Sequence, residues 1–453
     1  MTDRTNVLRS RILPIAVALA LCAPGAFGAA RAQEAPPYVV VISIDGLPPS
    51  TYTAPGGPAV PTLRRLAAEG AYARGVVGVF PSVTYPSHTA MMTGLRPDRH
   101  GIYNNRILDP EDRSNAGWYW YARDVKAPTL PGVVRARGLR AAAVSWPVTV
   151  GADLDFLVPE FARSEHPETL ALLSALSKPS TLLDDVEAAR GEPLPWPLTD
   201  RERTDMAAWI IRVHRPHLLL LHIFDTDSAQ HAHGPGSPQA IEAIEAADRH
   251  VARVLEAIDA AGLRARTNVV VVSDHGFLPV TDRLQLNARF KQEGWIETDD
   301  RGRITRWDVY FQASGGSGFV FLKDPSDTGL RAKVRAVVEA VAADPANGVQ
   351  QVLSEEDLRE LGADPRASFA VDMRAGFYTG YGHDALLAPA PSKGGHGFHP
   401  ERPELHASLI MAGPQVPPTG DLGVVRMTQL APTLASWFGV GLSPDADEPL
   451  DLR

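Results

Sequence analysis

Cysteine is almost absent from this chain of 453 residues, which contains a single one, Cys22. One cysteine excludes a disulfide-stabilised scaffold and any Cys-x-x-Cys zinc or redox site. The formal net charge of −9 also leaves no excess of basic residues. An acidic chain of this kind is not expected to carry a surface that binds a nucleic-acid backbone. A hydrophobic fraction of 44% and a charged fraction of 21% exclude a disordered chain and are typical of a globular protein.

The sequence also lacks an apolar run of the roughly 20 residues that a membrane span needs. An apolar stretch from Ile12 to about Ala20 contains Pro14, follows three arginines and precedes the small-x-small sequence Ala30-Arg31-Ala32. Residues 1–32 therefore predict a secretory signal peptide. The alternatives are a membrane anchor and a lipoprotein signal at Cys22, but Leu21 stands where a small residue is expected. We expect a periplasmic or secreted mature protein, residues 33–453, with no membrane span and no cysteine.

Short apolar runs alternate with amphipathic helical patterns along the mature chain. Strands are predicted at 38–44, 141–144, 218–223 and 269–272, with a weaker one at 408–411, and helices at 62–69, 237–261 and 330–343. Runs that are continuously apolar indicate strands buried on both faces. The pattern predicts one α/β domain with three α/β/α layers around a largely parallel sheet. The less regular stretch between His275 and His396 predicts an insertion within about 281–390 that caps one edge of the sheet.

Acidic and imidazole side chains follow three of these predicted strands. In parallel sheets such residues meet at one edge, where ligands bind. One aspartate after a strand often only caps the next helix. Several carboxylates at one edge repel each other unless a cation neutralises them, and Asp/His sets without thiolates suit Zn²⁺. There are enough ligands for two metal ions, the usual arrangement for displacement at phosphorus; the residues are Asp45, Asp225, Asp227, His231, His233, Asp274 and His275, with His396 later in the chain.

A hydroxyl nucleophile is available in the segment from Phe80 to Gly94. Pro86 suits the first turn of a helix, so Thr84 would lie just ahead of a helix N-terminus. The helix dipole and a bound metal would both favour an oxyanion there. The alternative is that Thr84 only caps the helix, and Ser82, Ser87 and Thr89 compete for either role.

Five motifs in order resemble the nucleotide pyrophosphatase/phosphodiesterase family of the alkaline phosphatase superfamily. They are SIDGL, FPSVTYPSHTAMMTGLRPDRHGIYNN, DTDSAQHAHGP, SDHGF and GGHGF, which together span roughly Val39 to Pro400. The resemblance implies an alkaline phosphatase-like fold and hydrolysis of phosphodiester or phosphoanhydride bonds in small substrates such as nucleotides.

The resemblance also implies a role for each matching residue. Two Zn²⁺ ions per chain would be bound, and Asn105 would donate a hydrogen bond to a phosphoryl oxygen. Thr84 would attack phosphorus, and water would then hydrolyse the phospho-threonine. One zinc would be held by Asp45, Thr84, Asp274 and His275, and the other by Asp227, His231 and His396. Asn104 is an alternative to Asn105, and the neighbouring His233 and His399 are interpreted as residues outside the ligand set.

Two further positions bear on the substrate. The family grips a nucleobase between an aromatic residue after the nucleophile and a tyrosine five residues before the Asp-x3-His motif. Tyr85 matches the aromatic residue, but His222 stands in place of the tyrosine. Both are therefore candidate substrate-binding residues, and the substitution puts specificity for nucleotides in question. The aromatic run 118–121 is predicted either to line a pocket or to pack against a loop.

Three other functions are alternatives to a phosphodiesterase. A phosphomonoesterase or phosphonate hydrolase would use the same fold, but monoesterases usually add a cationic Lys-x-Arg pair, which is missing between Asn105 and Leu220. A sulfatase would need a Cys or Ser signature that Thr84-Tyr85-Pro86-Ser87-His88 does not match. A non-catalytic protein that binds zinc or a phosphorylated ligand would have lost its nucleophile or ligands, and neither is lost. The oligomeric state does not follow from the sequence.

Overall fold

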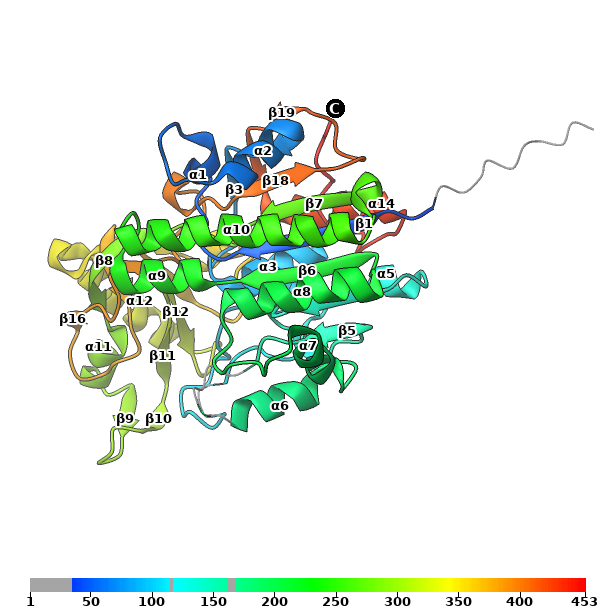
Figure 1. Ribbon diagram of the computed structural model, residues 1–453. Helices are drawn as coiled ribbons and strands as arrows, with labels where there is room; N and C mark the ends of the chain where they lie inside the picture. The colour runs from blue at the N-terminus through cyan, green and yellow to red at the C-terminus, as the bar shows by residue number, and fades with distance from the viewer. Residues whose placement is uncertain (1–34, 115–116, 162–165, 167) are drawn as a thin grey trace, which may run out of the picture. The chain divides into compact units, whose positions relative to one another are not determined.

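The centre of the computed structural model is a sheet of eight strands (Figure 1). The structure describes residues 35–114, 117–161, 166 and 168–453, so the predicted signal peptide at 1–32 lies outside the described residues. The strand order is β19 (Gly420–Asp421), β2 (Ala71–Tyr72), β18 (Leu409–Ala412), β7 (Thr267–Val272), β1 (Tyr38–Ile44), β6 (Leu218–Ile223), β4 (Ala141–Val144) and β5 (Phe156–Val158).

Five neighbouring strands of this sheet, from β7 to β5, run parallel. The register pairs Ile44 at the end of β1 with Ile223 at the end of β6, and Ser43 with Val272 at the end of β7. These three strands therefore end level with one another. The weaker strand of the sequence pattern is β18, which is shifted by one residue and runs antiparallel to both β7 and β2.

Helices cover both faces of the sheet. Alternate residues of β1 point to opposite sides: Val40 and Ile42 belong to one apolar core, and Val39 and Val41 belong to the other. In Figure 1 the long helices α8 and α10 lie across one face. The three-layer α/β/α prediction is confirmed. The first core includes α2 (Pro61–Glu69), α6 (Glu168–Leu176), α7 (Leu182–Arg190), α8 (Asp200–His214) and α10 (Pro238–Ala260), and the second includes α3 (Thr84–Thr93), α5 (Leu130–Ala136) and α14 (Leu430–Phe438).

The segment 281–390 contains a separate antiparallel sheet in the order β11 (Val309–Ser314), β12 (Ser317–Leu322), β14 (Phe369–Met373) and β13 (Val349–Leu353). Its own apolar core includes Phe290, Phe311 and Val338. Strand β8 (Leu278–Leu284) leads from the end of β7 into this region and pairs with β15 (Gly376–Thr379), β16 (Leu387–Pro389) and β17 (Gly394–Gly395). The region also holds the hairpin of β9 (Ile296–Thr298) and β10 (Ile304–Trp307), and helices α11 (Leu286–Gln292), α12 (Thr328–Ala343) and α13 (Glu355–Leu361).

The remaining elements are short and lie in the connections. They are α1 (Ser50–Thr53), α4 (Pro97–His100), α9 (Asp225–His233), the pair β3 (Gly75–Val77) and β20 (Val424–Arg426), and 3₁₀ turns at Ala122–Asp124, Arg264–Arg266, Pro345–Asn347, Pro403–Leu405 and Met427–Gln429. Across the described part of the chain, we find no helix with the length and apolar character required to cross a membrane.

Candidate metal centre and active site

A first group of possible metal ligands lies where β1 and β7 end. Asp45 follows β1, Asp274 and His275 follow β7, and all three are at most 2% exposed. His275 Nε2 is 3.3 Å from Asp45 Oδ1 and 3.1 Å from Asp274 Oδ2. The other oxygen of Asp274 accepts a hydrogen bond from the backbone N–H of Gly46 at 3.1 Å. The protein thus holds one atom of the carboxylate and leaves Oδ2 facing the group.

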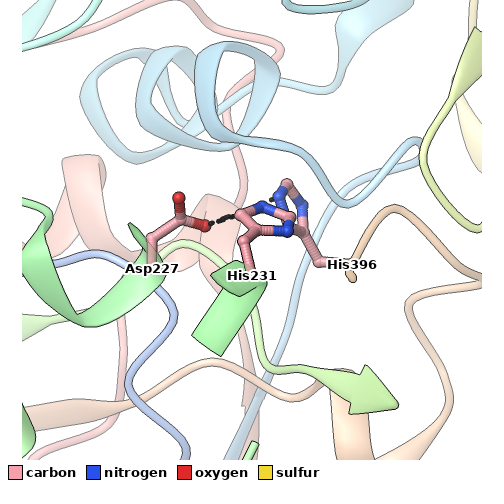
Figure 2. Close-up of side chains that lie close together, drawn as sticks. All are labelled: Asp227, His231 and His396. Carbon is pink, nitrogen blue, oxygen red and sulfur yellow. Dashed lines mark ion pairs between the residues drawn. The ribbon is translucent and has the colours of Figure 1, made fainter. Parts of the chain in front are cut away.

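A second group consists of Asp227, His231 and His396 (Figure 2). Asp227 and His231 lie one turn apart on α9, which brings them to the same face of the helix. Asp227 Oδ1 is 3.3 Å from His231 Nε2 and 3.6 Å from His396 Nε2. The Nδ1 atoms of the histidines face backbone carbonyls, of Gly394 at 2.8 Å for His231 and of Ser82 at 3.2 Å for His396. Such contacts orient an imidazole so that Nε2 can bind a metal.

The two groups adjoin each other. The rings of His275 and His396 stack with their centroids 3.5 Å apart and an angle of 8° between their planes. The six residues therefore form one continuous cluster of carboxylates and imidazoles. This is the set that the sequence motifs single out, and the structure divides it into the same two groups.

The cluster has the properties of a site built for cations. Four buried atoms have no hydrogen-bond partner: Asp45 Oδ1, Asp227 Oδ1, Asp274 Oδ2 and His275 Nε2. Burial, with the charges of Asp274 and Asp227, raises the pKa of Asp45 to about 7. Burial opposes a charged His275, but the adjacent Asp274 raises its pKa to about 9. A bound divalent cation would pair with the unpartnered atoms and relieve the repulsion between the carboxylates. A set of nitrogen and oxygen donors without sulfur fits Zn²⁺.

Thr84 is the first residue of α3 and is 4% exposed. The sequence interpretation places Thr84 just ahead of the helix or at its cap. Thr84 is instead the first helical residue, and Val83 takes the capping position without a side-chain hydrogen bond. One turn later, His88 Nδ1 is 2.8 Å from the carbonyl oxygen of Thr84 and 3.8 Å from Asp274 Oδ2. The first turn of α3 therefore packs directly against the first metal group.

Asn105 lies beside this helix start. Its Oδ1 accepts a hydrogen bond from the backbone N–H of Tyr85 at 2.8 Å. That bond fixes the amide orientation and leaves its NH₂ group as a donor. Asn104, in contrast, is 4% exposed and its amide contacts the carbonyl of Ala313 and the hydroxyl of Ser314. The geometry favours Asn105 over Asn104 as the residue that could donate to a substrate.

A cavity of about 400 Å³ opens over Thr84, Asn105 and the second metal group. Its other lining residues come from the 281–390 segment, from Pro391 just after it, and from the loop that follows α4 and contains Arg106 and Trp118. Trp118 lines the cavity and stacks on Trp120 with centroids 5.5 Å apart, so the aromatic run contributes one residue to a pocket. The sequence interpretation missed most of these lining residues, because they belong to no motif; they include Arg106, Arg283, Gln285, Ser314, Tyr378 and Tyr381.

The two predicted substrate-binding residues lie elsewhere. Tyr85 is 0% exposed, and its hydroxyl donates to Glu160 Oε1 at 3.0 Å. His222 is 1% exposed, and its Nε2 is 3.1 Å from Asp45 Oδ2. Burial disfavours a charged ring, yet hydrogen bonds with Asp45 and Glu160 raise the pKa of His222 to about 10. Neither residue lines the cavity: the Tyr85 ring packs against Trp118 and Trp120, and the His222 ring lies against Asp45.

Comparison with known proteins identifies the family. A sequence model described as type I phosphodiesterase / nucleotide pyrophosphatase matches residues 39–383. The chain belongs to this family. Ectonucleotide pyrophosphatase/phosphodiesterase family member 1 of Rattus norvegicus is 25% identical over 259 residues, which are 54% of this chain and 24% of the rat protein. The match thus spans about a quarter of the length of that curated relative.

Solved structures of the family share the fold. Human ectonucleotide pyrophosphatase/phosphodiesterase 5 superposes with a TM-score of 0.64 at 19% identity, over 90% of this chain and 96% of that one. An inactive murine form of the same protein, solved in complex with AMP, gives a TM-score of 0.63 at 19% identity. The family match contains Thr84, Asn105 and the candidate ligands before residue 383, whereas His396 lies beyond it.

Proposed function

We propose that this protein is a two-zinc phosphoric diester hydrolase that cleaves phosphodiester or phosphoanhydride bonds of small nucleotide-like substrates. The observation that carries the proposal is the pair of Asp/His groups, joined by the stacked rings of His275 and His396, beside Thr84 at the start of α3. Family membership supports the hydrolase class. The complex of a structural neighbour with AMP supports a nucleotide as the substrate.

Asp45, Asp274 and His275, together with the Thr84 hydroxyl, would hold one zinc, and Asp227, His231 and His396 would hold the other. When bound, the metals lower the pKa of a hydroxyl or water and neutralise charge on phosphoryl oxygens. Thr84 Oγ, having lost its proton, forms a bond to phosphorus while the bond to the leaving group breaks. Water then attacks phosphorus, the Oγ–P bond breaks, and Thr84 regains a proton.

The remaining groups of the site orient the substrate. The NH₂ group of Asn105 donates to a non-bridging phosphoryl oxygen, where charge accumulates in the transition state. The segment 281–390 acts as the cap of the site, since it supplies Arg283 and Tyr381 to the cavity wall. We further propose export, based on the signal-peptide pattern of residues 1–32.

The cavity also supports a second candidate, hydrolysis of phosphomonoesters or of substrates with a further phosphate. Arg106 and Arg283 line it, and the Arg106 guanidinium lies over the rings of Trp118 and Tyr381. Arginine binds phosphate oxygens in a bidentate manner, so these two side chains could replace the cationic pair that the sequence lacks.

A rate panel on the purified enzyme tests these alternatives. We expect bis-p-nitrophenyl phosphate to be hydrolysed well above p-nitrophenyl phosphate, with dinucleotides, a nucleoside triphosphate and a phosphonate measured alongside. Equal or reversed rates would overturn the diesterase proposal and favour the monoesterase. In that case Arg106→Ala and Arg283→Ala should slow monoester hydrolysis more than diester hydrolysis.

A further inference from the structure

A buried row of hydrogen bonds lies behind the first metal group. Tyr85 donates its hydroxyl to Glu160 Oε1 at 3.0 Å. Glu160 Oε2 is 3.4 Å from His222 Nδ1, and His222 Nε2 is 3.1 Å from Asp45 Oδ2. Tyr85, Glu160, His222 and Asp45 are each at most 8% exposed. A run of polar groups this deep in a protein is costly unless each member is satisfied, so its arrangement is strongly specified.

His222 is held from both sides. Nδ1 faces the carbonyl oxygen of Ser145 at 3.1 Å as well as Glu160, and Nε2 faces Asp45. All three partners are oxygen acceptors, so both ring nitrogens are positioned to donate. The ring therefore cannot rotate without losing hydrogen bonds at both ends.

The contact with His222 distinguishes the two oxygens of Asp45. Oδ2 faces His222, whereas Oδ1 has no hydrogen-bond partner and lies 3.3 Å from His275 Nε2. His222 thus turns one carboxylate oxygen away from the metal group and directs the other toward it. Carboxylates that bind metals are commonly oriented by hydrogen bonds from residues that do not touch the metal.

The other end of the row reaches the substrate side of the site. The backbone N–H of Tyr85 donates to Asn105 Oδ1 at 2.8 Å, and Tyr85 follows Thr84 in α3. One residue, Tyr85, therefore joins Asn105 through its backbone and Glu160 through its side chain. The metal ligand Asp45 and the proposed phosphoryl-binding Asn105 are linked by a continuous set of contacts.

We propose that His222, held by Glu160, is a positioning residue that fixes the Asp45 carboxylate for metal binding, and that Tyr85 extends this support to Asn105. The inference rests on the proposed function, since it assigns Asp45 to a metal. It gives His222 a role in place of the substrate contact expected from the sequence. Glu160 belongs to none of the motifs, and its contacts with His222 and Tyr85 bring it beside the site.

The test measures zinc affinity by competition with a chelator, together with kcat, KM and thermal unfolding of the zinc-free protein. Removal of such a support typically weakens metal binding or activity about 10- to 100-fold. In His222→Phe and Glu160→Gln we expect zinc affinity at one of the two sites to fall by about 10- to 100-fold. A smaller loss is expected in His222→Gln, which keeps one donor for Asp45. In each variant kcat should fall more than KM changes.

Two further variants keep the test informative. Tyr85→Phe removes only the hydroxyl that contacts Glu160, so it should fold and lower zinc affinity several-fold. Glu202→Gln is the matched control, because Glu202 is an equally buried carboxylate that accepts from Thr199 instead. It should lower thermal stability without changing zinc affinity.

The outcomes separate the inference from the proposed function. Wild-type protein that binds no zinc would overturn both. Wild-type protein with two zinc ions and variants that lose thermal stability alone, with unchanged zinc affinity, would overturn the inference and leave the proposed function standing. Equal zinc affinity in His222→Gln and His222→Phe would contradict the role of the donor to Asp45.

Discussion

At the scale of single residues, three candidate metal ligands share one arrangement. The protein contacts one side-chain atom of Asp274, His231 and His396 and leaves another atom facing the cluster. Asp274 Oδ1 accepts from Gly46, His231 Nδ1 faces the carbonyl of Gly394, and His396 Nδ1 faces that of Ser82. This pre-orientation means that little rearrangement is needed to bind a metal.

Substitution of Thr84, the proposed nucleophile, should separate the chemical step from metal binding. Thr84→Ala should lower kcat by at least about a thousandfold, as loss of a nucleophile does in other hydrolases. The variant should keep its zinc, because the six Asp and His ligands are unchanged. Ser87→Ala, one turn along α3, is the control and should stay active. Turnover in Thr84→Ala comparable to that of the wild-type protein would show that another residue is the nucleophile.

Metal binding should depend on pH in a defined direction. The pKa of Asp45 is about 7 and that of His275 about 9 when no cation neutralises the cluster. Both groups must lose a proton to bind zinc, so affinity should rise with pH. Chelator competition at pH 5.5 and pH 7.5 should show an increase of at least about tenfold. The same affinity at both values would be inconsistent with these residues as ligands.

At the scale of elements, strand ends and helix starts assemble the site. Strands β1, β6 and β7 are parallel and end level, so Asp45, the start of α9 and Asp274 arise at one edge. Helix α3 brings Thr84 to the same edge from another part of the chain. The strand ends were predictable because continuous apolar runs mark buried strands. The antiparallel direction of β18 was not, since a run of four apolar residues carries no information on direction.

A glycine in the turn after β7 provides a test at this scale. A Cβ on Gly276 would lie 2.1 Å from the backbone oxygen of Glu404, so Gly276→Ala must displace the segment that carries His275. Such overpacking typically costs about 1–3 kcal/mol. We expect a lower thermal midpoint and weaker zinc binding. At Gly441 a Cβ would meet nothing within 4 Å, so Gly441→Ala should change neither. Identical behaviour of the two variants would contradict this close packing.

At the scale of the whole molecule, a chain with a net negative charge must still attract the anionic substrates that we propose. The chain has a formal net charge of −9, yet the proposed substrates are anions. Attraction must therefore be local, from bound cations and from Arg106 and Arg283 at the cavity. A low-dielectric cleft concentrates such a field even on a protein of opposite net charge.

Removal of metal should affect both activity and stability. Chelation should abolish hydrolysis and lower the thermal midpoint, because buried carboxylates are left to repel one another. A ligand present at 1,000 times its Kd stabilises the folded state by about 4 kcal/mol per site. Addition of zinc should restore the activity and the midpoint, which differential scanning calorimetry and a diester assay would follow. Full activity in excess chelator would refute the metal-dependent proposal.

The α/β/α class, the main strands and the motif residues follow from the amino-acid sequence, because apolar periodicity and motif spacing are local properties. The residues that surround the motifs became visible only in the folded chain. Tyr85 and His222 are buried and contact Glu160, whereas Arg283 and Tyr381, which are far from Thr84 in the sequence, line the same cavity as Thr84. Such contacts depend on how segments that are far apart in the sequence pack together, and a pattern within one segment carries no information on that packing.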